Sequence, residues 1–215
     1  MDLVAENLTF YYRGRKKQPV LEHVDLTIRQ GERVGLKAPS GRGKTTLCKL
    51  LAGYERPKQG RVLAGGTDVM EYKGVCPVQM IWQHPEMAAD PLLRLGESMR
   101  LAGLTGEKLA ERMEQLGIRE EWMSRFPSEL SGGELQRFCL ARALRPEVKF
   151  LLCDEISAML DLVTQARIWR FLLEEAKERE LGLLVVSHDE ALLRQVCTRL
   201  ITLPETKRNE ESYCD

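Results

Sequence analysis

Asp154 and Glu155 follow an apolar stretch, residues 148–153, that predicts a buried strand. Neighbouring residues in a strand point to opposite faces, so the two carboxylates can take different tasks. Asp154 suits a Mg²⁺ ion, because hard cations prefer oxygen ligands. Glu155 suits a general base that polarises an attacking water molecule. The pair therefore predicts chemistry on a water molecule next to a bound metal ion.

A glycine-rich loop, residues 38–46, follows a short predicted strand and opens a predicted helix. Gly41 and Gly43 let backbone N–H groups turn toward phosphate oxygens, and the helix N-terminus adds partial positive charge. Lys44 can reach the β- and γ-phosphates of a nucleotide, and Thr45 can place a hydroxyl on Mg²⁺. Ala38 stands where such a loop usually begins with glycine, which removes some backbone freedom. The candidate phosphate ligands of the loop are Ser40, Gly41, Gly43, Lys44, Thr45 and Thr46.

A second glycine segment opens another predicted helix at residues 131–134. Ser131 is a favourable helix cap. Gly132 and Gly133 each cost roughly 1 kcal/mol in a helix, so contact with a ligand explains them better than helix stability does. The segment Ser131, Gly132, Gly133 and Glu134 is therefore a second candidate phosphate-binding surface. Two such surfaces on one chain suggest a nucleotide held between two copies or relatives of the chain.

These motifs, in this order and spacing, resemble those of the nucleotide-binding subunit of an ABC (ATP-binding cassette) transporter, and the resemblance spans nearly the whole chain. It implies an ATPase in which two cassettes close on ATP and Mg²⁺. Each ATP would lie between Lys44 and Thr45 of one subunit and residues 131–134 of the other. Phosphoryl transfer depends on positioning and charge, so the site would be complete only when both halves meet.

The same resemblance implies roles for four further residues. Gln83 would bind Mg²⁺ and sense the transport partner, and His188 would contact the γ-phosphate. Asp161 would end the loop that crosses to the other subunit. Tyr12 would stack on the adenine, with Tyr11 as the alternative.

Details narrow the resemblance to ATPases that import peptides or nickel. His84-Pro85 and Asp90-Pro91 follow Gln83 at the spacing found in that group, and residues 160–168 resemble its Leu-Asp…Gln-Ala run. The chain ends without the usual C-terminal extension, which favours the shorter, nickel-type members. Ala158-Met159 differ from the group's pattern beside the loop that crosses to the other subunit. Coupling between the two ATP sites is the property that this difference affects.

Strands that alternate with helices predict an α/β fold with a parallel sheet and right-handed crossovers. The resemblance implies a P-loop NTPase core with flanking helices, an N-terminal antiparallel β subdomain and a small helical subdomain. We expect residues 1–84 and 128–205 to form the core, residues 85–127 the helical subdomain, and residues 206–215 a polar tail. Within the core, strands are predicted at 8–12 and 20–28, and a helix at 43–52.

Composition excludes several classes of protein. Lys+Arg and Asp+Glu both number 32, so net charge gives no reason to expect a nucleic-acid partner. The strongest apolar stretch, 181–186, is far shorter than the ~20 residues that a membrane span needs. No signal peptide is visible at the N-terminus. The cysteines show no C-x-x-C spacing and are expected to be reduced thiols; they are Cys48, Cys76, Cys139, Cys153, Cys197 and Cys214.

The resemblance also implies partners and a location. We expect a second ATPase subunit, two separate membrane permease subunits, an extracytoplasmic solute-binding protein acting indirectly, and a peripheral position on the cytoplasmic side of the cell membrane. The second ATPase can be identical or related, and the solute can be nickel, another metal complex or a short peptide. The main alternative is an accessory ATPase outside a transporter, for example in phosphonate breakdown. A P-loop kinase has no need of Ser131-Gly132-Gly133, and a regulator without turnover has no need of Glu155 and His188.

Overall fold

A five-stranded parallel sheet forms the centre of the computed structural model, which describes residues 1–12, 14, 18–39, 41–157 and 160–203. Its strands are β3 (Arg33–Lys37), β6 (Val78–Ile81), β7 (Phe150–Asp154), β8 (Gly182–Val186) and β9 (Arg199–Thr202). They lie in the order β6-β7-β8-β3-β9. Every residue of β7 and β8 is buried, as expected for strands covered on both faces. The predicted α/β class is confirmed.

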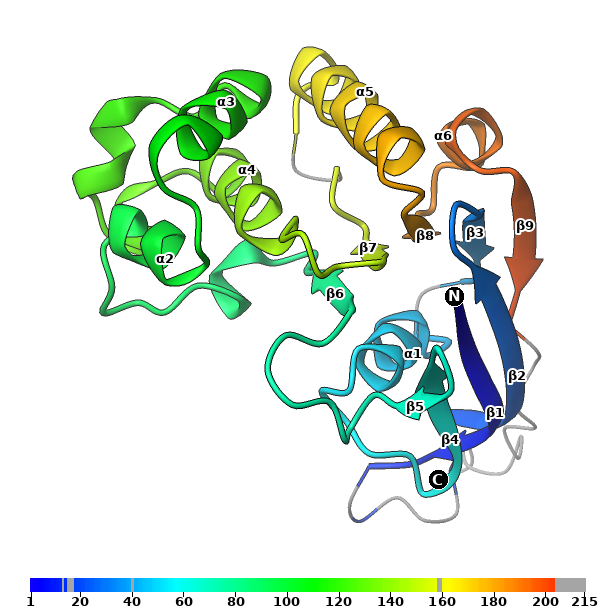
Figure 1. Ribbon diagram of the computed structural model, residues 1–215. Coiled ribbons are helices and arrows are strands. Elements are labelled where there is room, and N and C mark those ends of the chain that lie inside the picture. Colours follow the sequence, from blue (N-terminus) through cyan, green and yellow to red (C-terminus); the bar gives the residue numbers. More distant parts are fainter. Residues whose placement is uncertain (13, 15–17, 40, 158–159, 204–215) are drawn as a thin grey trace, which may run out of the picture.

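A smaller antiparallel sheet packs beside the parallel one (Figure 1). Its strands, in the order β2-β1-β4-β5, are β1 (Asp2–Phe10), β2 (Leu21–Arg29), β4 (Gln59–Ala64) and β5 (Thr67–Asp68). Helix α1 (Lys44–Leu51) fills the space between the sheets, because Leu47 and Leu51 share one hydrophobic cluster with residues of both. The N-terminal antiparallel β subdomain expected from the sequence is therefore present.

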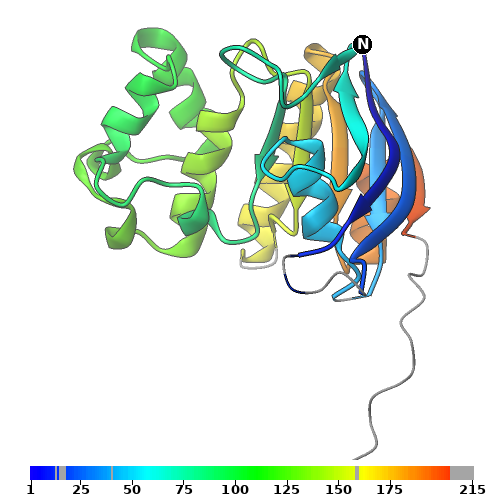
Figure 2. The same ribbon diagram turned by 90° about the horizontal axis from the view of Figure 1, so that it is seen from below.

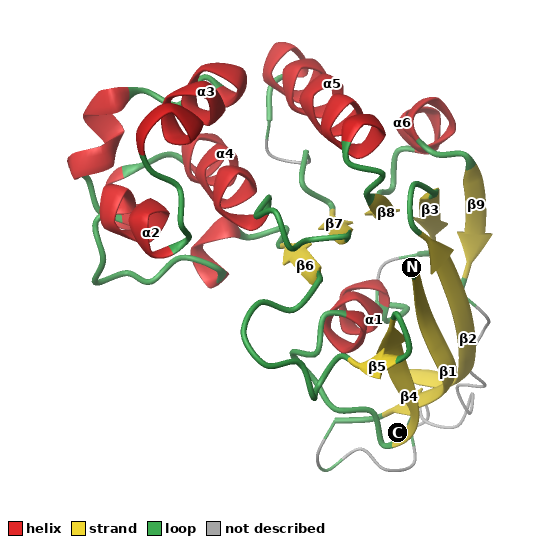
Figure 3. Cartoon of the chain, in the orientation of Figure 1, coloured by secondary structure: helices red, strands yellow, loops and turns green. Residues whose placement is uncertain are grey.

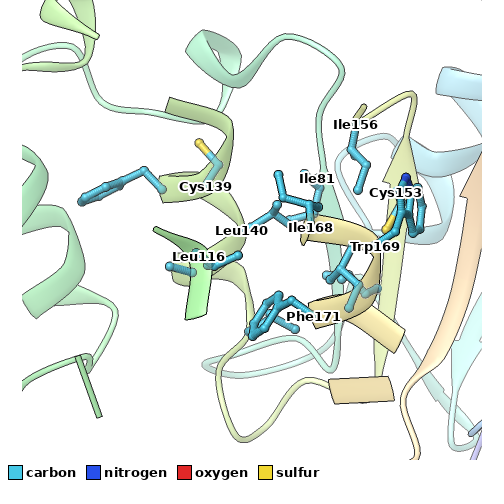
Figure 4. Packing of buried hydrophobic residues seen from close by; sticks show 14 of the residues in the cluster. Ile81, Leu116, Cys139, Leu140, Cys153, Ile156, Ile168, Trp169 and Phe171 are labelled. Atoms are coloured by element: carbon cyan, nitrogen blue, oxygen red, sulfur yellow. The ribbon is translucent and has the colours of Figure 1, made fainter. Parts of the chain in front are cut away.

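Three helices cover the other face of the parallel sheet (Figure 3). They are α4 (Gly132–Ala143), α5 (Leu162–Glu178) and α6 (Glu190–Val196). Alternate residues of β7 face the two sides: Leu152 packs with α1, whereas Cys153 packs with α5. Figure 4 shows Ile168 and Phe171 of α5 in this second cluster, with Leu140 of α4 nearby.

The chain between β6 and α4 is helical. Its elements are η1 (Pro85–Met87), α2 (Leu95–Leu101), α3 (Gly106–Leu116), η2 (Glu120–Ser124) and η3 (Pro127–Glu129). They form, with α4 beside them, the end of the molecule opposite the antiparallel sheet (Figure 2). The sequence predicts this helical character. Gly103, with a φ of 78°, lies between α2 and α3 and outside both helices. The limits of a subdomain at 85–127 stay a prediction.

Local patterns predict the long elements better than the short ones. The first predicted strand, 8–12, in fact begins at Asp2 and ends at Phe10. β4, β5 and β6 have no counterpart in the prediction, because each is short and depends on partners far away in the sequence: β6 pairs with β7. The predicted strands 20–28 and 148–153 and the predicted helix 43–52 agree with β2, β7 and α1 apart from one or two residues at their ends.

No helix of the described residues is long and apolar enough to cross a membrane. The cysteines in the described ranges are all free thiols. Burial raises the pKa of Cys139 and of Cys197 to about 11, which keeps both as thiols. Cys214 lies outside the described residues.

Candidate functional site

The site lies where four neighbouring parallel strands end. β3 leads into the glycine loop, β7 into Asp154 and Glu155, β8 into His188, and β6 into Gln83. Because β6, β7, β8 and β3 are adjacent and parallel, their carboxyl ends lie at one edge of the sheet. Ligands of open α/β sheets bind at this edge. The topology thus gathers segments that are far apart in the sequence.

The glycine loop wraps around the ammonium group of Lys44. Gly41 and Gly43 have φ values of 75° and 88°, a region that side chains disfavour. A Cβ on Gly43 would also come within 2.9 Å of a methyl carbon of Val20. Lys44 Nζ donates hydrogen bonds to the carbonyl oxygens of Ala38 at 2.8 Å and of Pro39 at 3.2 Å. Ala38 therefore contributes its backbone, and Ser40 lies outside the described residues.

Glu155 is held at both carboxylate oxygens. His188 Nε2 lies 2.8 Å from Glu155 Oε1, and Gln83 Nε2 donates to Glu155 Oε2 at 3.1 Å. Lys44 Nζ lies 3.9 Å from Oε1 and 3.4 Å from His188 Nε2. The three predicted catalytic residues and the lysine thus form one connected group.

The backbone of Glu155 adopts a conformation that is rare for a residue with a side chain. Its φ is 50°, which costs of order 1–3 kcal/mol in a non-glycine residue. The N–H of Glu155 donates to the carbonyl oxygen of Val186 in β8 at 3.0 Å. The adjacent strand therefore helps to hold the carboxylate in place.

Asp154 and Thr45 bring two oxygen ligands together. Thr45 Oγ1 donates to Asp154 Oδ2 at 2.7 Å, and only 2% of Asp154 is exposed. Burial raises the pKa of Asp154, and Glu155 raises it further, while the hydrogen bond from Thr45 and the charge of Lys44 act in the opposite direction. A hydroxyl and a carboxylate suit Mg²⁺, which is usually bound by one or two protein ligands together with water and phosphate. The described residues contain no cluster of three or more His, Cys, Asp or Glu side chains able to hold a metal.

These residues surround an open pocket of about 420 Å³. Its lining consists of Tyr12, Val20, Gly41, Gly43, Lys44, Thr45, Thr46, Gln83, Glu155 and His188. Tyr12 stands at its edge, with 40% of the residue exposed. Its hydroxyl lies 3.1 Å from Thr46 Oγ1, and its ring packs edge-on against Phe10. Tyr11 is not among the lining residues, so the geometry supports Tyr12 as the aromatic partner of a base.

Val20 is the pocket residue that the sequence analysis missed. It precedes β2 and lies against Gly43 of the glycine loop. A valine at the start of a predicted strand carries no local signal for a ligand. Only the packing of the antiparallel sheet beside the loop reveals it.

The segment 131–134 lies outside this pocket, as expected for a surface that acts on a second subunit. Ser131 caps α4, and its N–H and hydroxyl both lie 2.8 Å from Glu134 Oε2. These contacts lower the pKa of Glu134. Ser131 and Gly132 are exposed, so the N-terminal turn of α4 is accessible.

Asp161 is also separate from the pocket. It caps α5 by accepting hydrogen bonds from the backbone N–H groups of Val163 and Thr164, each at 3.0 Å. The hydrogen bonds from Thr164 and Val163 lower the pKa of Asp161. Residues 158 and 159, where the sequence departs from the pattern of the importers, lie outside the described residues.

Comparison with known proteins gives a consistent result. The family model described as "ABC transporter" matches residues 21–158. The Nickel import ATP-binding protein NikE of Pseudomonas putida is 35% identical over 206 residues, which cover 89% of this chain and 76% of the relative. The Nickel import system ATP-binding protein NikE of Staphylococcus aureus is 31% identical, with 93% and 85% covered.

Solved structures agree with the sequence comparison. The dimeric structure of MJ0796, a bacterial ABC transporter cassette, superposes with a TM-score of 0.80 at 25% identity and 94% coverage of both chains. A dimeric post-hydrolysis form of the same cassette, bound to ADP and Pi, gives a TM-score of 0.81 at 25% identity, again with 94% of each chain covered.

Proposed function

The chain belongs to the ABC transporter family, and on this premise we propose that it is the ATP-binding and ATP-hydrolysing subunit of an ABC importer. The observation that carries the proposal is the pocket at the strand ends, whose lining includes Lys44, Thr45, Glu155 and His188. Asp154 lies beside it, hydrogen-bonded to Thr45. A phosphate-binding loop, a general base and a hard-cation site within one pocket are the parts that ATP hydrolysis requires.

The pocket residues have different roles in hydrolysis. Lys44 and the N–H groups of the glycine loop stabilise negative charge on the β- and γ-phosphates. Glu155 takes a proton from the attacking water molecule. The oxygen of that water bonds to the γ-phosphorus, and the bond between the γ-phosphorus and the β–γ bridging oxygen breaks. ADP and phosphate are the products. His188, whose Nε2 lies 2.8 Å from Glu155 Oε1, orients Glu155 and contacts the γ-phosphate.

Thr45, Asp154 and Gln83 are the residues that would hold Mg²⁺. The ion would add positive charge to the phosphate oxygens when bound with the nucleotide. The carboxylate of Asp154, in hydrogen-bond contact with the Thr45 hydroxyl, supports this assignment because both groups offer oxygen ligands. Gln83, from the end of β6, connects this site to the helical segment that follows it in the chain.

A second cassette would complete the site. Ser131, Gly132, Gly133 and Glu134 of one subunit would contact the ATP held by Lys44 of the other, and Asp161 would cross between them. The exposed N-terminal turn of α4 supports this arrangement, because free backbone N–H groups at a helix N-terminus bind phosphate. The partner can be a second copy or, as we expect, a related ATPase.

Closure of the two cassettes would drive a change in two membrane permease subunits that contact them. A groove of about 430 Å³, between β6, η1, α2 and α4, is a suitable contact surface. Tyr54, Met87 and Leu101 line it and are exposed apolar residues, and such patches mark interaction sites. The chain would therefore lie peripherally on the cytoplasmic side of the membrane, with a solute-binding protein acting on the other side.

Nickel or another metal complex is the solute that we propose, with short peptides as the alternative. The support is the similarity to relatives named as nickel import ATP-binding proteins. None of the pocket residues would contact the solute, so permease and solute-binding protein would select it.

Glu155→Gln tests the proposal directly. Without the base, the chain should bind ATP-Mg²⁺ but hydrolyse it at least about 100-fold more slowly, and two subunits should remain closed. Light scattering after size exclusion, with and without ATP-Mg²⁺, measures the pairing. The matched control, Lys44→Ala with Glu155→Gln, should stay single. A Glu155→Gln chain that binds ATP yet never pairs, alone or with a co-expressed related cassette, would contradict the proposal.

A further inference from the structure

A group of three charged side chains lies outside the nucleotide pocket, with Glu175 buried and Arg112 and Arg179 partly buried. Glu175 of α5 is paired at both oxygens: its Oε1 lies 2.9 Å from Arg112 Nη1, and its Oε2 lies 3.1 Å from Arg179 Nη1. The Glu175 side chain is only 10% exposed. Removing charges from water is costly, and replacing such a group by apolar residues is often neutral or stabilising. Stability alone is therefore a weak reason for this group.

The group joins three helices that belong to different parts of the molecule. Arg112 comes from α3 of the helical segment, whereas Glu175 lies near the end of α5 over the parallel sheet. Arg179 donates hydrogen bonds to the carbonyl oxygens of Leu144 and Val148, each at 3.3 Å. These carbonyls lie at and beyond the end of α4, where donors and positive charge are favourable.

The group lies where the C-terminal ends of α4 and α5 meet. α4 begins at the second phosphate-binding segment, residues 131–134, and α5 begins next to Asp161. Both helices are stiff, and their far ends meet through Arg179 and Glu175. Glu175 and Arg179 therefore link the far ends of two helices whose starts would face the partner subunit.

The contact between Arg112 and Glu175 is close but poorly aligned. Arg112 Nη1 is buried and has no partner with hydrogen-bond geometry among the described residues, although the Glu175 oxygen is 2.9 Å away. Hydrogen bonds weaken steeply when the N–H points away from the acceptor. The Arg112 guanidinium lies over the ring of Phe171, 5.1 Å from its centre, a surface on which it can turn. Turning the guanidinium on this surface, through its own torsions or through a change in the orientation of α3 relative to α5, would align the bond.

We propose that Arg112, Glu175 and Arg179 are positioning residues, which set the orientation of the helical segment and α4 relative to α5. The Arg112–Glu175 hydrogen bond becomes aligned when two cassettes close, and so favours closure. This inference rests on the proposed function, because it needs a closed pair of cassettes.

Arg112→Met is the first test. Methionine keeps an unbranched stem over Phe171 and leaves Glu175 paired with Arg179. In the Glu155→Gln background, alone or with a related cassette, pairing driven by ATP-Mg²⁺ should weaken about 10-fold, the effect of one charge-assisted hydrogen bond. ATP affinity of the single chain should stay within about 2-fold, because no pocket residue changes. The matched control is Arg170→Met, an exposed arginine on α5, the helix that carries Glu175, which should leave pairing unchanged.

A double-mutant cycle separates positioning from simple stability. Glu175→Gln should weaken pairing as Arg112→Met does, and the two changes together should cost little more than either one. Additive effects, or pairing that is unaffected in folded Arg112→Met protein, would overturn the inference and leave the proposed function intact. Failure of the Glu155→Gln parent to pair would overturn both.

Discussion

The two side chains that contact the Glu155 carboxylate would also take part in the reaction that Glu155 would catalyse. His188 and Gln83 contact its two oxygens, and each is also a candidate contact of the nucleotide or its metal ion. A change at any one of these residues therefore alters both the orientation of the base and the binding of ATP. Effects of single substitutions in this group should be non-additive.

Lys44→Ala should weaken ATP binding by at least about 10-fold, because charge-assisted bonds to phosphate are worth roughly 1.5–3 kcal/mol. Only 5% of Lys44 is exposed, so the change also leaves the carbonyl groups of the loop without their donor. Titration calorimetry with ATP-Mg²⁺ measures the affinity. Lys49→Ala, on the same helix, is the control, and an unchanged affinity in Lys44→Ala would refute the phosphate-binding assignment.

Asp154→Asn should stabilise the protein in the absence of nucleotide and abolish Mg²⁺-dependent hydrolysis. Folding raises the pKa of Asp154 above 3.8, so the folded chain binds a proton more readily between 3.8 and its raised pKa. The free energy of unfolding therefore falls as pH rises through this window, and the carboxylate costs stability above it.

Thermal unfolding of Asp154→Asn and its parent at several pH values tests this sign. Near neutral pH the variant should melt higher, by about 2–4 °C for each kcal/mol gained, and the gain should shrink in acid. The exposed Asp2→Asn serves as control. A melting temperature for Asp154→Asn below that of the parent at neutral pH would show that the buried carboxylate is stabilising.

At the scale of elements, helix starts carry much of the candidate chemistry. α1 starts at Lys44, α4 after Ser131, and α5 after Asp161. The first faces the pocket beside its own strand ends, whereas the other two open onto separate surfaces. The start of α1 would therefore serve ATP binding within one subunit, whereas the starts of α4 and α5 would serve the closure of two subunits.

Ser131→Arg should therefore spare ATP binding by the single chain and prevent closure. The arginine loses a cap worth about 1 kcal/mol and adds bulk to an exposed helix start. Pairing of the Glu155→Gln background, followed by light scattering, should fall below detection. Ser131→Ala, which loses the cap without added bulk, should keep most of the pairing. Weaker ATP binding by the single Ser131→Arg chain would place Ser131 at its own subunit's nucleotide.

At the scale of the whole molecule, the helical segment lies at one end and the antiparallel sheet at the other (Figure 2). The nucleotide pocket lies at the carboxyl ends of the parallel strands. The segment shares a hydrophobic cluster with α4 and α5, in which Trp122 is buried. Movement at the pocket can therefore reach the segment through packed helices rather than through a flexible linker.

Leu101→Glu should uncouple the chain from its membrane subunits. Leu101 lines the groove between α2 and β6 and is 58% exposed, so a charge there opposes apolar contact. Co-purification with the permease should drop about 10-fold or more, while ATP binding by the isolated chain should not change. Met70→Glu, outside the groove, is the control. Normal co-purification of Leu101→Glu would exclude this groove as the contact surface.

The sequence by itself determined the local parts of the site. Glycine spacing, the lysine at a helix start and paired acids after an apolar strand are patterns of adjacent residues, so Gly43, Lys44 and Asp154 could be named without a structure. The parallel α/β core was predictable for the same reason, because its long helices and buried strands carry their own periodicity. Agreement between the local motifs and the overall fold is typical of a sequence that specifies one structure.

The tertiary structure alone decided what depends on distant residues. The short strand β6 exists through its pairing with β7, and it is this strand that brings Gln83 to Glu155. The place of Val20 in the pocket and the Arg112–Glu175 contact follow from packing between elements. None of them leaves a local pattern, because side chains meet through the fold and not through their order in the chain.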